Sequence, residues 1–396
     1  MSEWKEYKLG EIAEITSSKR IFYSEYVPSG VPFYRSKEII DLYNKRDVAT
    51  ELYISQERYN EIKDKFGVPQ KDDVLLTSVG SLGVPYKVKD DDHFYFKDGN
   101  LTWFKDINTD IILPDYFVFW LTSSIGKQKL DEITIGSTQA ALTISGLKTI
   151  DIALPPLDEQ KRIASILSSL DDKIDLLNRE NTTLEAMAET LFRQWFIEEA
   201  KEDWEEGKLG DILSVKGGTT PSTKESRYWD GDIAWTSPRD VTTLNGIYLF
   251  QTEKTITEAG LKQISSGLLP KGTLLMSSRA PVGVLAFAEI PLTINQGYIA
   301  ILDNKGYAKE FIYLWLKANM DLVHSYSNGS TFMEISKSAF KSLDITIPSR
   351  KEVADFVKMV KTYFDKIKLN EKQIRLITKQ RDILLPKLMS NEINIL

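Results

Sequence analysis

The sequence predicts an α+β fold in which two mixed α/β domains are separated by two long helices. We expect these helices to pair with each other as an intramolecular antiparallel coiled coil. Two observations lead to this prediction. The chain of 396 residues repeats itself with a period of about 200 residues, and each copy ends in a long segment with a heptad pattern. The predicted molecule is therefore a pseudo-twofold internal repeat.

The repeat is visible in short motifs that recur in the same order. These are Lys8-Leu9-Gly10 and Lys208-Leu209-Gly210, Tyr116-Phe117-Val118-Phe119-Trp120-Leu121 and Phe311-Ile312-Tyr313-Leu314-Trp315-Leu316, and Gly136-Ser137-Thr138 and Gly329-Ser330-Thr331. The period is too long for a solenoid, in which units of a few tens of residues stack on each other. Each copy is therefore a domain followed by its helix.

The motifs and the breaks between them divide the chain into four segments. We expect a first domain at residues 1–155, a first long helix at 156–200, a second domain at 201–348 and a second long helix at 349–396. Within the domains, the short apolar runs 73–77 and 272–276 predict buried strands, and 115–131 and 309–323 have helical spacing. Residues 216–221 and 325–330 are rich in turn-forming residues and predict loops.

The first long helix is predicted over residues 157–199. Its apolar residues alternate in steps of four and three from Ile163 to Trp195, and Asn181 is the polar exception in this seam. Pro155 and Pro156 end the preceding segment, and we expect Asp158 to be the N-cap.

The second long helix, predicted over 349–391, keeps the same alternation, with Pro386 in its last turn as a kink or an end. Antiparallel pairing with full overlap sets Asn181 against Asn370, and Trp195 against Phe356. Parallel pairing would leave both amides in an apolar seam, at about 1–3 kcal/mol each. We therefore predict that Asn181 and Asn370 fix the register.

The charges of the two helical segments are complementary. Residues 158–199 carry five basic and ten acidic residues, whereas 350–392 carry eleven basic and six acidic ones. A self-paired first helix would repel itself, and the mixed pair attracts. The alternative is two surface helices, each packed on its own domain.

The bulk composition narrows the class of protein. The chain has no cysteine and a net charge of −7, and no apolar run approaches the ~18 residues of a membrane span. Its polar start, MSEWKEYKLG, predicts no signal peptide. We therefore expect a cytoplasmic protein that does not bind to a membrane. The acidic balance means that any nucleic-acid surface is a local patch.

Catalytic signatures are absent from the sequence. His93 and His324 are the only histidines, and there is no phosphate-binding loop or strand-linked dinucleotide motif. The run Leu154-Pro155-Pro156-Leu157 lacks both the leading polar residue and the closing aromatic of an amino-methyltransferase tetrapeptide. We therefore expect no catalytic residue, no metal and no cofactor in this chain.

Several loops carry side chains that suit contacts with nucleic acid. Arg and Lys pair with guanine edges, Asn and Gln with adenine, and Ser and Thr with phosphates. In the first domain the candidates are Lys19, Arg20, Arg35, Lys37, Ser78 and Asn100. In the second domain they are Lys216, Thr219, Thr220, Arg239, Ser278, Arg279 and Gln296. For each residue, the alternative is turn capping or a satisfied buried amide.

The order of domain, long helix, divergent domain and long helix resembles the specificity subunit (S, HsdS-type) of type I restriction-modification systems, along essentially the whole chain. The motifs that carry the resemblance are Leu154-Pro155-Pro156-Leu157-Asp158-Glu159-Gln160-Lys161-Arg162-Ile163, Leu191-Phe192-Arg193-Gln194-Trp195-Phe196, Leu384-Leu385-Pro386-Lys387-Leu388, Gly217-Gly218-Thr219, Ser277-Ser278-Arg279-Ala280 and Asn295-Gln296-Gly297. The first domain departs from this pattern, with Ser17-Ser18-Lys19 and Gly99-Asn100 at the corresponding places.

The resemblance implies two target-recognition domains, each of which reads one half of a split, asymmetric site in double-stranded DNA. It also implies that the helices set the half-site spacing and bind two modification subunits, and that restriction subunits join them. S-adenosylmethionine, ATP and Mg are then expected on the partner subunits, for adenine-N6 methylation and ATP-driven cleavage. The alternatives are a coiled-coil scaffold with two protein-binding end domains and no DNA role, and a self-sufficient methyltransferase, which the missing motifs oppose.

Overall fold

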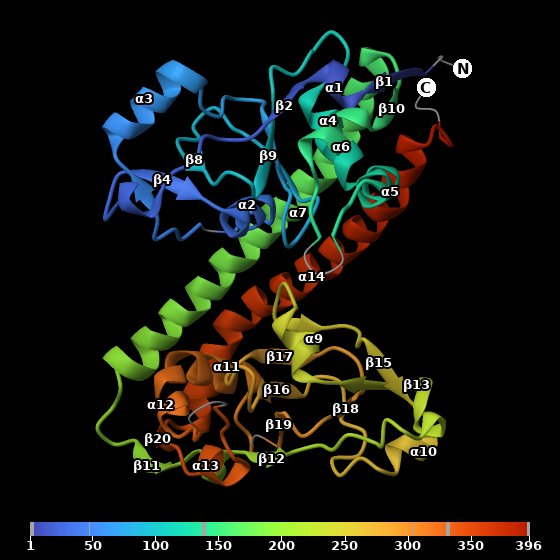
Figure 1. Cartoon of the computed structure of the whole chain (residues 1–396). Coiled ribbons are helices and arrows are strands. Elements are labelled where there is room, and N and C mark those ends of the chain that lie inside the picture. Colours follow the sequence, from blue (N-terminus) through green and yellow to red (C-terminus); the bar gives the residue numbers. More distant parts are fainter. Residues whose placement is uncertain (1–3, 47, 137–139, 304, 330–332, 394–396) are drawn as a thin grey trace. The chain divides into compact units, whose positions relative to one another are not determined.

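The computed structural model of the chain describes residues 4–46, 48–136, 140–303, 305–329 and 333–393 (Figure 1). The matched motifs at Ser137-Thr138 and Ser330-Thr331 lie outside these residues. The chain forms two compact units. Unit 1 comprises Met1–Asp175 and Arg375–Leu396, and unit 2 comprises Leu176–Ile374. Each unit thus combines one predicted domain with part of both long helices.

The described residues of unit 1 form three small sheets and a set of short helices. Its strands are β1 (Lys5–Lys8), β2 (Glu14–Thr16), β3 (Tyr26–Val27), β4 (Val31–Tyr34), β5 (Tyr53–Ile54), β6 (Val74–Thr77), β7 (Pro85–Lys87), β8 (Tyr95–Phe96), β9 (Leu101–Lys105) and β10 (Asp151–Leu154). Its shorter helices are α1 (Leu9–Ile12), η1 (Tyr23–Glu25), α2 (Ser36–Tyr43), α3 (Gln56–Phe66), α4 (Pro114–Thr122), α5 (Ser124–Glu132) and α6 (Ile144–Thr149). The sheet orders are β2-β9-β6-β7, β3-β5-β4-β8 and β1-β10.

Unit 2 repeats this plan with longer central strands. Its strands are β11 (Glu205–Lys208), β12 (Ser214–Lys216), β13 (Trp229–Thr236), β14 (Tyr248–Leu249), β15 (Lys254–Ile256), β16 (Leu274–Ser277), β17 (Leu285–Ala288), β18 (Thr293–Ile294), β19 (Tyr298–Asp303) and β20 (Asp344–Ile347). Its shorter helices are η2 (Gln194–Glu198), α8 (Leu209–Ile212), η3 (Ser226–Tyr228), α9 (Pro238–Thr242), α10 (Glu258–Leu261), α11 (Lys309–Ala318), α12 (Met320–Ser325) and α13 (Lys337–Lys341). The sheet orders are β12-β19-β16-β17-β14, β15-β13-β18 and β11-β20.

The predicted buried strands are β6 and β16, whose four residues each are all buried. The two expected helices at 115–131 and 309–323 are each broken into a pair. Ser123 separates α4 from α5 because its Oγ accepts the N–H of Gly126 and caps the second helix. Asn319 separates α11 from α12.

The two long helices are present, as α7 (Leu157–Arg193) and α14 (Arg350–Met389), drawn in green and red in Figure 1. The expected N-cap at Asp158 is wrong. The carbonyl of Pro156 already accepts the N–H groups of Glu159 and Gln160, so the helix begins one residue before Asp158. At the other end, α7 passes into one π-helical turn, η2. Pro386 lies in the last turn of α14, as expected.

The helices pack against each other inside both units. In unit 1, Arg381 Nη1 of α14 lies 2.8 Å from Asp171 Oδ1 of α7. In unit 2, Asn370 Nδ2 donates to Asn181 Oδ1 at 2.8 Å. Trp195 lies 14 residues after Asn181 on α7, and Phe356 lies 14 residues before Asn370 on α14. The rings of Trp195 and Phe356 are 5.9 Å apart.

These contacts run in opposite directions along the two helices, so the predicted fold class with an antiparallel helix pair is confirmed. The two predicted contacts, between Asn181 and Asn370 and between Trp195 and Phe356, are both present. The Asn370 side chain is fully buried, and its Nδ2 also donates to Glu180 Oε2 at 2.9 Å. That this amide pair fixes the register stays a prediction.

Each unit builds its own core around its part of the helix pair. In unit 1, Ile163 and Leu167 of α7 share a cluster with Leu388 of α14 and the buried face of α4. In unit 2, Phe192 of α7 and Phe356 of α14 share a cluster with β16, β19 and α11. The long helices are thus part of the domain cores, which excludes two helices that each pack on one domain alone.

Candidate nucleic-acid interface

Three loops that carry predicted site residues meet in unit 2. The N–H of Ser278 donates to the carbonyl of Gly297 at 2.8 Å, and the N–H of Asn295 donates to the carbonyl of Thr236 at 3.0 Å. These bonds hold together the loop after β16, the loop between β18 and β19 and the end of β13. Gly297 is required at this junction, because a Cβ there would lie 2.7 Å from Pro238 Cγ.

Unit 1 joins its loops by the same bonds. The N–H of Ser78 donates to the carbonyl of Asn100 at 2.8 Å, and the N–H of Lys97 donates to the carbonyl of Tyr34 at 2.8 Å. A third pair matches as well, because Leu142 donates to the carbonyl of Ser78 as Ile335 does to that of Ser278. The two units therefore share a backbone frame while their loop side chains differ.

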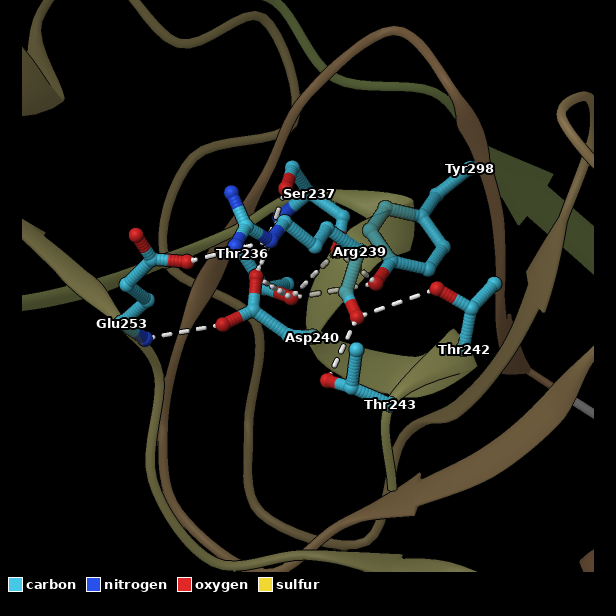
Figure 2. A network of polar contacts seen from close by, with 8 residues as sticks. All are labelled: Thr236, Ser237, Arg239, Asp240, Thr242, Thr243, Glu253 and Tyr298. Atoms are coloured by element: carbon cyan, nitrogen blue, oxygen red, sulfur yellow. Dashed lines mark hydrogen bonds and ion pairs between the residues drawn. The ribbon is translucent and has the colours of Figure 1, made fainter. Parts of the chain in front are cut away.

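Asp240 organises the first of these loops in unit 2 (Figure 2). Its Oδ2 accepts hydrogen bonds from Ser237 N at 2.9 Å and from Thr236 Oγ1 at 3.1 Å, and its Oδ1 accepts from Glu253 N at 2.8 Å. Tyr298, on β19, donates its hydroxyl proton to the carbonyl of Ser237 at 2.6 Å. The start of α9 is thus fixed by one carboxylate and one buried phenol.

This frame presents Arg239 to solvent. Its side chain is 76% exposed and forms an ion pair with Glu253, at 3.8 Å. Its backbone carbonyl is held by the hydroxyls of Thr242, at 3.1 Å, and Thr243, at 2.9 Å. In unit 1 the corresponding first-turn residue is Lys37, which is also exposed. A fixed backbone with an exposed cationic side chain suits contact with a phosphate or a base edge.

The loop at residues 216–221 lies against the same region of unit 2. Gly218 leaves no room for a side chain, because a Cβ would lie 1.7 Å from the carbonyl oxygen of Ile294. Thr220 Oγ1 donates to Gln296 Oε1 at 2.7 Å, and both side chains are exposed. Thr219 is instead used inside the unit, with its Oγ1 donating to the carbonyl of Gln263 at 2.7 Å. The exposed amide of Gln296 is therefore oriented by Thr220.

The equivalent loop of unit 1 has a cationic edge. Lys19 and Arg20 are exposed, and the N–H of Lys19 donates to the Tyr95 hydroxyl at 2.7 Å. The Arg20 guanidinium lies 3.0 Å from Asp98, on the loop that carries Asn100. The structure thus brings Lys19, Arg20 and Asn100 onto neighbouring loops.

Arg35 is held more firmly than expected. Its Nη2 lies 2.8 Å from Glu38 Oε1, and its backbone N–H donates to Glu38 Oε2. Burial opposes ionisation of Glu38, but the hydrogen bonds from Arg35 outweigh it and lower the pKa of this carboxyl. A contact between Arg35 and a base would compete with this ion pair. Glu38 therefore holds in unit 1 the place that Asp240 holds in unit 2.

Three predicted residues lie apart from the solvent-facing set. Ser78 is 3% exposed, and its hydroxyl lies 2.6 Å from that of Thr102. Ser278 is also 3% exposed, although its hydroxyl has no partner among the described residues. Arg279 is half-buried and its backbone pairs with Glu334. The remaining candidate, Lys216, is exposed and reaches the carbonyl of Ser266 at 3.4 Å.

Some residues of this region were not predicted from the sequence. Glu38 and Asp240 lie three residues after the start of a helical turn, which is the spacing of a capping box and a usable signal. The exposed pair Phe22 and Tyr23 lies one residue after Arg20, and nothing in the local pattern marks its exposure.

Within the described parts of the chain, no group of three or more histidine, aspartate or glutamate side chains is placed to bind a metal ion. Nor do the described residues include a helix of the length and apolar content needed to span a bilayer.

The family model described as "Type I restriction modification DNA specificity domain" matches residues 1–186 and 201–379. The chain belongs to this family, and the predicted resemblance is confirmed.

Individual proteins similar to this chain are also type I specificity subunits. The chain is 23% identical to the type I restriction enzyme HindI specificity subunit of Haemophilus influenzae, over 99% of this chain and 100% of that protein. It is 40% identical to the MjaIX specificity subunit of Methanocaldococcus jannaschii, over 47% of this chain and 43% of that subunit. The crystal structure of a type I restriction-modification S subunit from M. genitalium shares the fold, with a TM-score of 0.59 and 19% identity, over 98% of this chain and 96% of that one.

Proposed function

We propose that the chain is the DNA-reading, non-catalytic subunit of a type I restriction-modification complex. Each unit reads one half of a bipartite, asymmetric site in double-stranded DNA. The observation that carries the proposal is the shared loop frame. Equivalent backbone bonds join the loops at Ser78 and at Ser278, while the side chains on those loops differ.

Two units that recognise different base sequences need the same backbone arrangement with different side chains on it. Backbone bonds fix where each loop lies, and exposed side chains decide which base edge is recognised. In unit 1 the exposed set is Lys19, Arg20 and Lys37, whereas in unit 2 it includes Arg239 and Gln296. We therefore propose that the two half-sites are unlike.

The helix pair supplies the second part of the proposal. With 37 residues at about 1.5 Å each, α7 is about 55 Å long, which exceeds the ~34 Å of one DNA turn. Half-site centres about one turn apart are compatible with that length. The helices would also bind two modification subunits, which restriction subunits join.

Cofactors belong to the partners in this proposal. S-adenosylmethionine would act on adenine N6 in the modification subunits, and ATP and Mg in the restriction subunits. The chain itself contributes no cofactor site, and the complex works on DNA in the cytoplasm.

The test is selection from a random-sequence duplex library by the chain purified with its partner subunits. We expect the enriched molecules to share two unlike words at a fixed separation. Binding should also fall steeply as salt rises, because cationic side chains release counterions from phosphates.

The second candidate, a scaffold with protein-binding ends, is favoured by the net charge of −7. It predicts no enriched word and no steep salt dependence. That result would overturn the proposed function.

A further inference from the structure

Two aromatic side chains project from unit 1 beside its candidate interface. Phe22 is 61% exposed and Tyr23 is 90% exposed. We call this pair the aromatic tip. Among the described residues, no large apolar side chain is more exposed than Tyr23. Neighbouring exposed aromatic rings are typical of binding surfaces, because water solvates them poorly.

The backbone of the aromatic tip is fixed by turn hydrogen bonds and by an ion pair of Glu25. The N–H of Phe22 donates to Glu25 Oε2 at 2.7 Å, and the N–H of Glu25 donates to the carbonyl of Phe22 at 2.9 Å. Arg58 Nε in turn lies 2.8 Å from Glu25 Oε1. Since the turn is already ordered, presenting both rings to a ligand costs little further entropy.

The surroundings of the aromatic tip are those of a nucleic-acid contact. Lys19 and Arg20 are both exposed and are separated from it only by the buried residue Ile21. Arg20 is bound to Asp98, on the loop that carries Asn100. The tip is therefore continuous with the loop cluster of unit 1.

Among the residues of unit 2 that the structure describes, no large aromatic side chain is exposed in this way. In the alignment of the two repeats, Ser222 and Thr223 stand where unit 1 has Phe22 and Tyr23. Because both rings of unit 1 are largely exposed, neither is a core residue. We therefore attribute the aromatic pair of unit 1 to a difference in what the two units bind.

We propose that the aromatic tip packs against bases of the first half-site and adds sequence discrimination to unit 1. The inference rests on the proposed function. Apolar contact of this kind can be made with a thymine methyl group or with the face of a partly unstacked base step. In either case the rings contribute apolar contact, and Lys19 and Arg20 contribute charge.

The test uses the complete complex and a duplex that carries the selected bipartite site. We expect the double variant F22A/Y23A to bind about 10-fold more weakly, the size of losing about one aromatic–base contact. Its thermal unfolding should be unchanged, because both rings are exposed. Y23F keeps the ring and should keep most of the affinity.

The second half-site is the internal control. Base substitutions in the first half-site should matter less to F22A/Y23A than to the parent complex, whereas substitutions in the second half-site should cost both equally. Replacing thymine by uracil in the first half-site reports a methyl contact, and 2-aminopurine fluorescence reports an unstacked step. A response to either probe that disappears in the variant supports the proposal.

Other outcomes overturn it. If F22A/Y23A binds and discriminates like the parent complex, the tip does not touch bases. If the variant loses its partner subunits instead, the tip is a protein contact. If the parent complex itself shows no sequence preference, the proposed function fails first and this inference falls with it.

Discussion

The Asn370→Asp substitution tests the helix pair most sharply, because it changes one atom group in a fully buried position. In the native chain, Asn370 Nδ2 lies 2.9 Å from Glu180 Oε2 and 2.8 Å from Asn181 Oδ1. Aspartate replaces this donor by a carboxyl oxygen. Two carboxyl groups then face each other at hydrogen-bond distance, where they cannot both be ionised.

The loss of stability in the variant can be calculated from the raised pKa of the carboxyl pair formed by Asp at position 370 and Glu180. Burial and a like charge raise such a pKa by about 3 units, which corresponds to about 4 kcal/mol. The folded pKa lies above the unfolded one, so the variant is most stable at low pH and loses stability as pH rises toward 7. About 3 kcal/mol of this loss falls between pH 5 and pH 8.

The assay is urea unfolding of parent and variant at pH 5 and pH 8. The expected result is a stability difference that grows with pH. In E180Q/N370D the like charge is gone and only burial still raises the pKa of the new carboxyl, so the pH dependence should become shallower. A pH-independent difference, or no rescue by E180Q, would refute the pairing of these side chains.

Three further predictions concern unit 2 and its counterpart in unit 1. Burial raises the pKa of Glu371 to about 7, although hydrogen bonds from two backbone N–H groups lower it; the charges of Glu185 and Glu289 raise it further. Because this pKa is higher in the folded than in the unfolded chain, the native stability should fall by about 3 kcal/mol from pH 5 to pH 8. Urea unfolding of E371Q should show a flatter pH profile than the parent, and an equally steep profile would contradict this. F356A removes a fully buried ring that packs on Trp195 and should cost about 4 kcal/mol, measured by the same unfolding, whereas a loss below 1 kcal/mol would refute the packing. In duplex-binding titrations, R239A should weaken discrimination in one half-site and K37A in the other; if both variants affect the same half-site, the two units do not read separate words.

The long helices could be predicted because their signal is periodic and local. The alternation from Ile163 to Trp195 has no glycine or proline inside it, and the polar exception, Asn181, constrains the partner. The start of α7 at residue 157 is predicted correctly, but its N-cap is not. The first turn is bound to the rest of unit 1 through Gln160, whose buried amide donates to the carbonyl of Ile111 and accepts the N–H of Leu113. Such a tertiary contact leaves no mark in the helix sequence.

The loops of the candidate interface could be predicted from the sequence, but which of their side chains are exposed could not. Residue type pointed to Arg239 and Gln296, which are exposed, and equally to Ser278, which is buried. Residue type cannot tell a serine that faces solvent from one that closes a core. The ion pair that holds Arg35 likewise depends on the folded position of Glu38.

The central claim is that two units of one chain read two different DNA words. Sequencing of methylated adenines in the host, with this chain present and then deleted, tests it most directly. The account predicts one bipartite, asymmetric motif that is methylated only when the chain is present. A single palindromic motif, or a methylation pattern unchanged by the deletion, would contradict it.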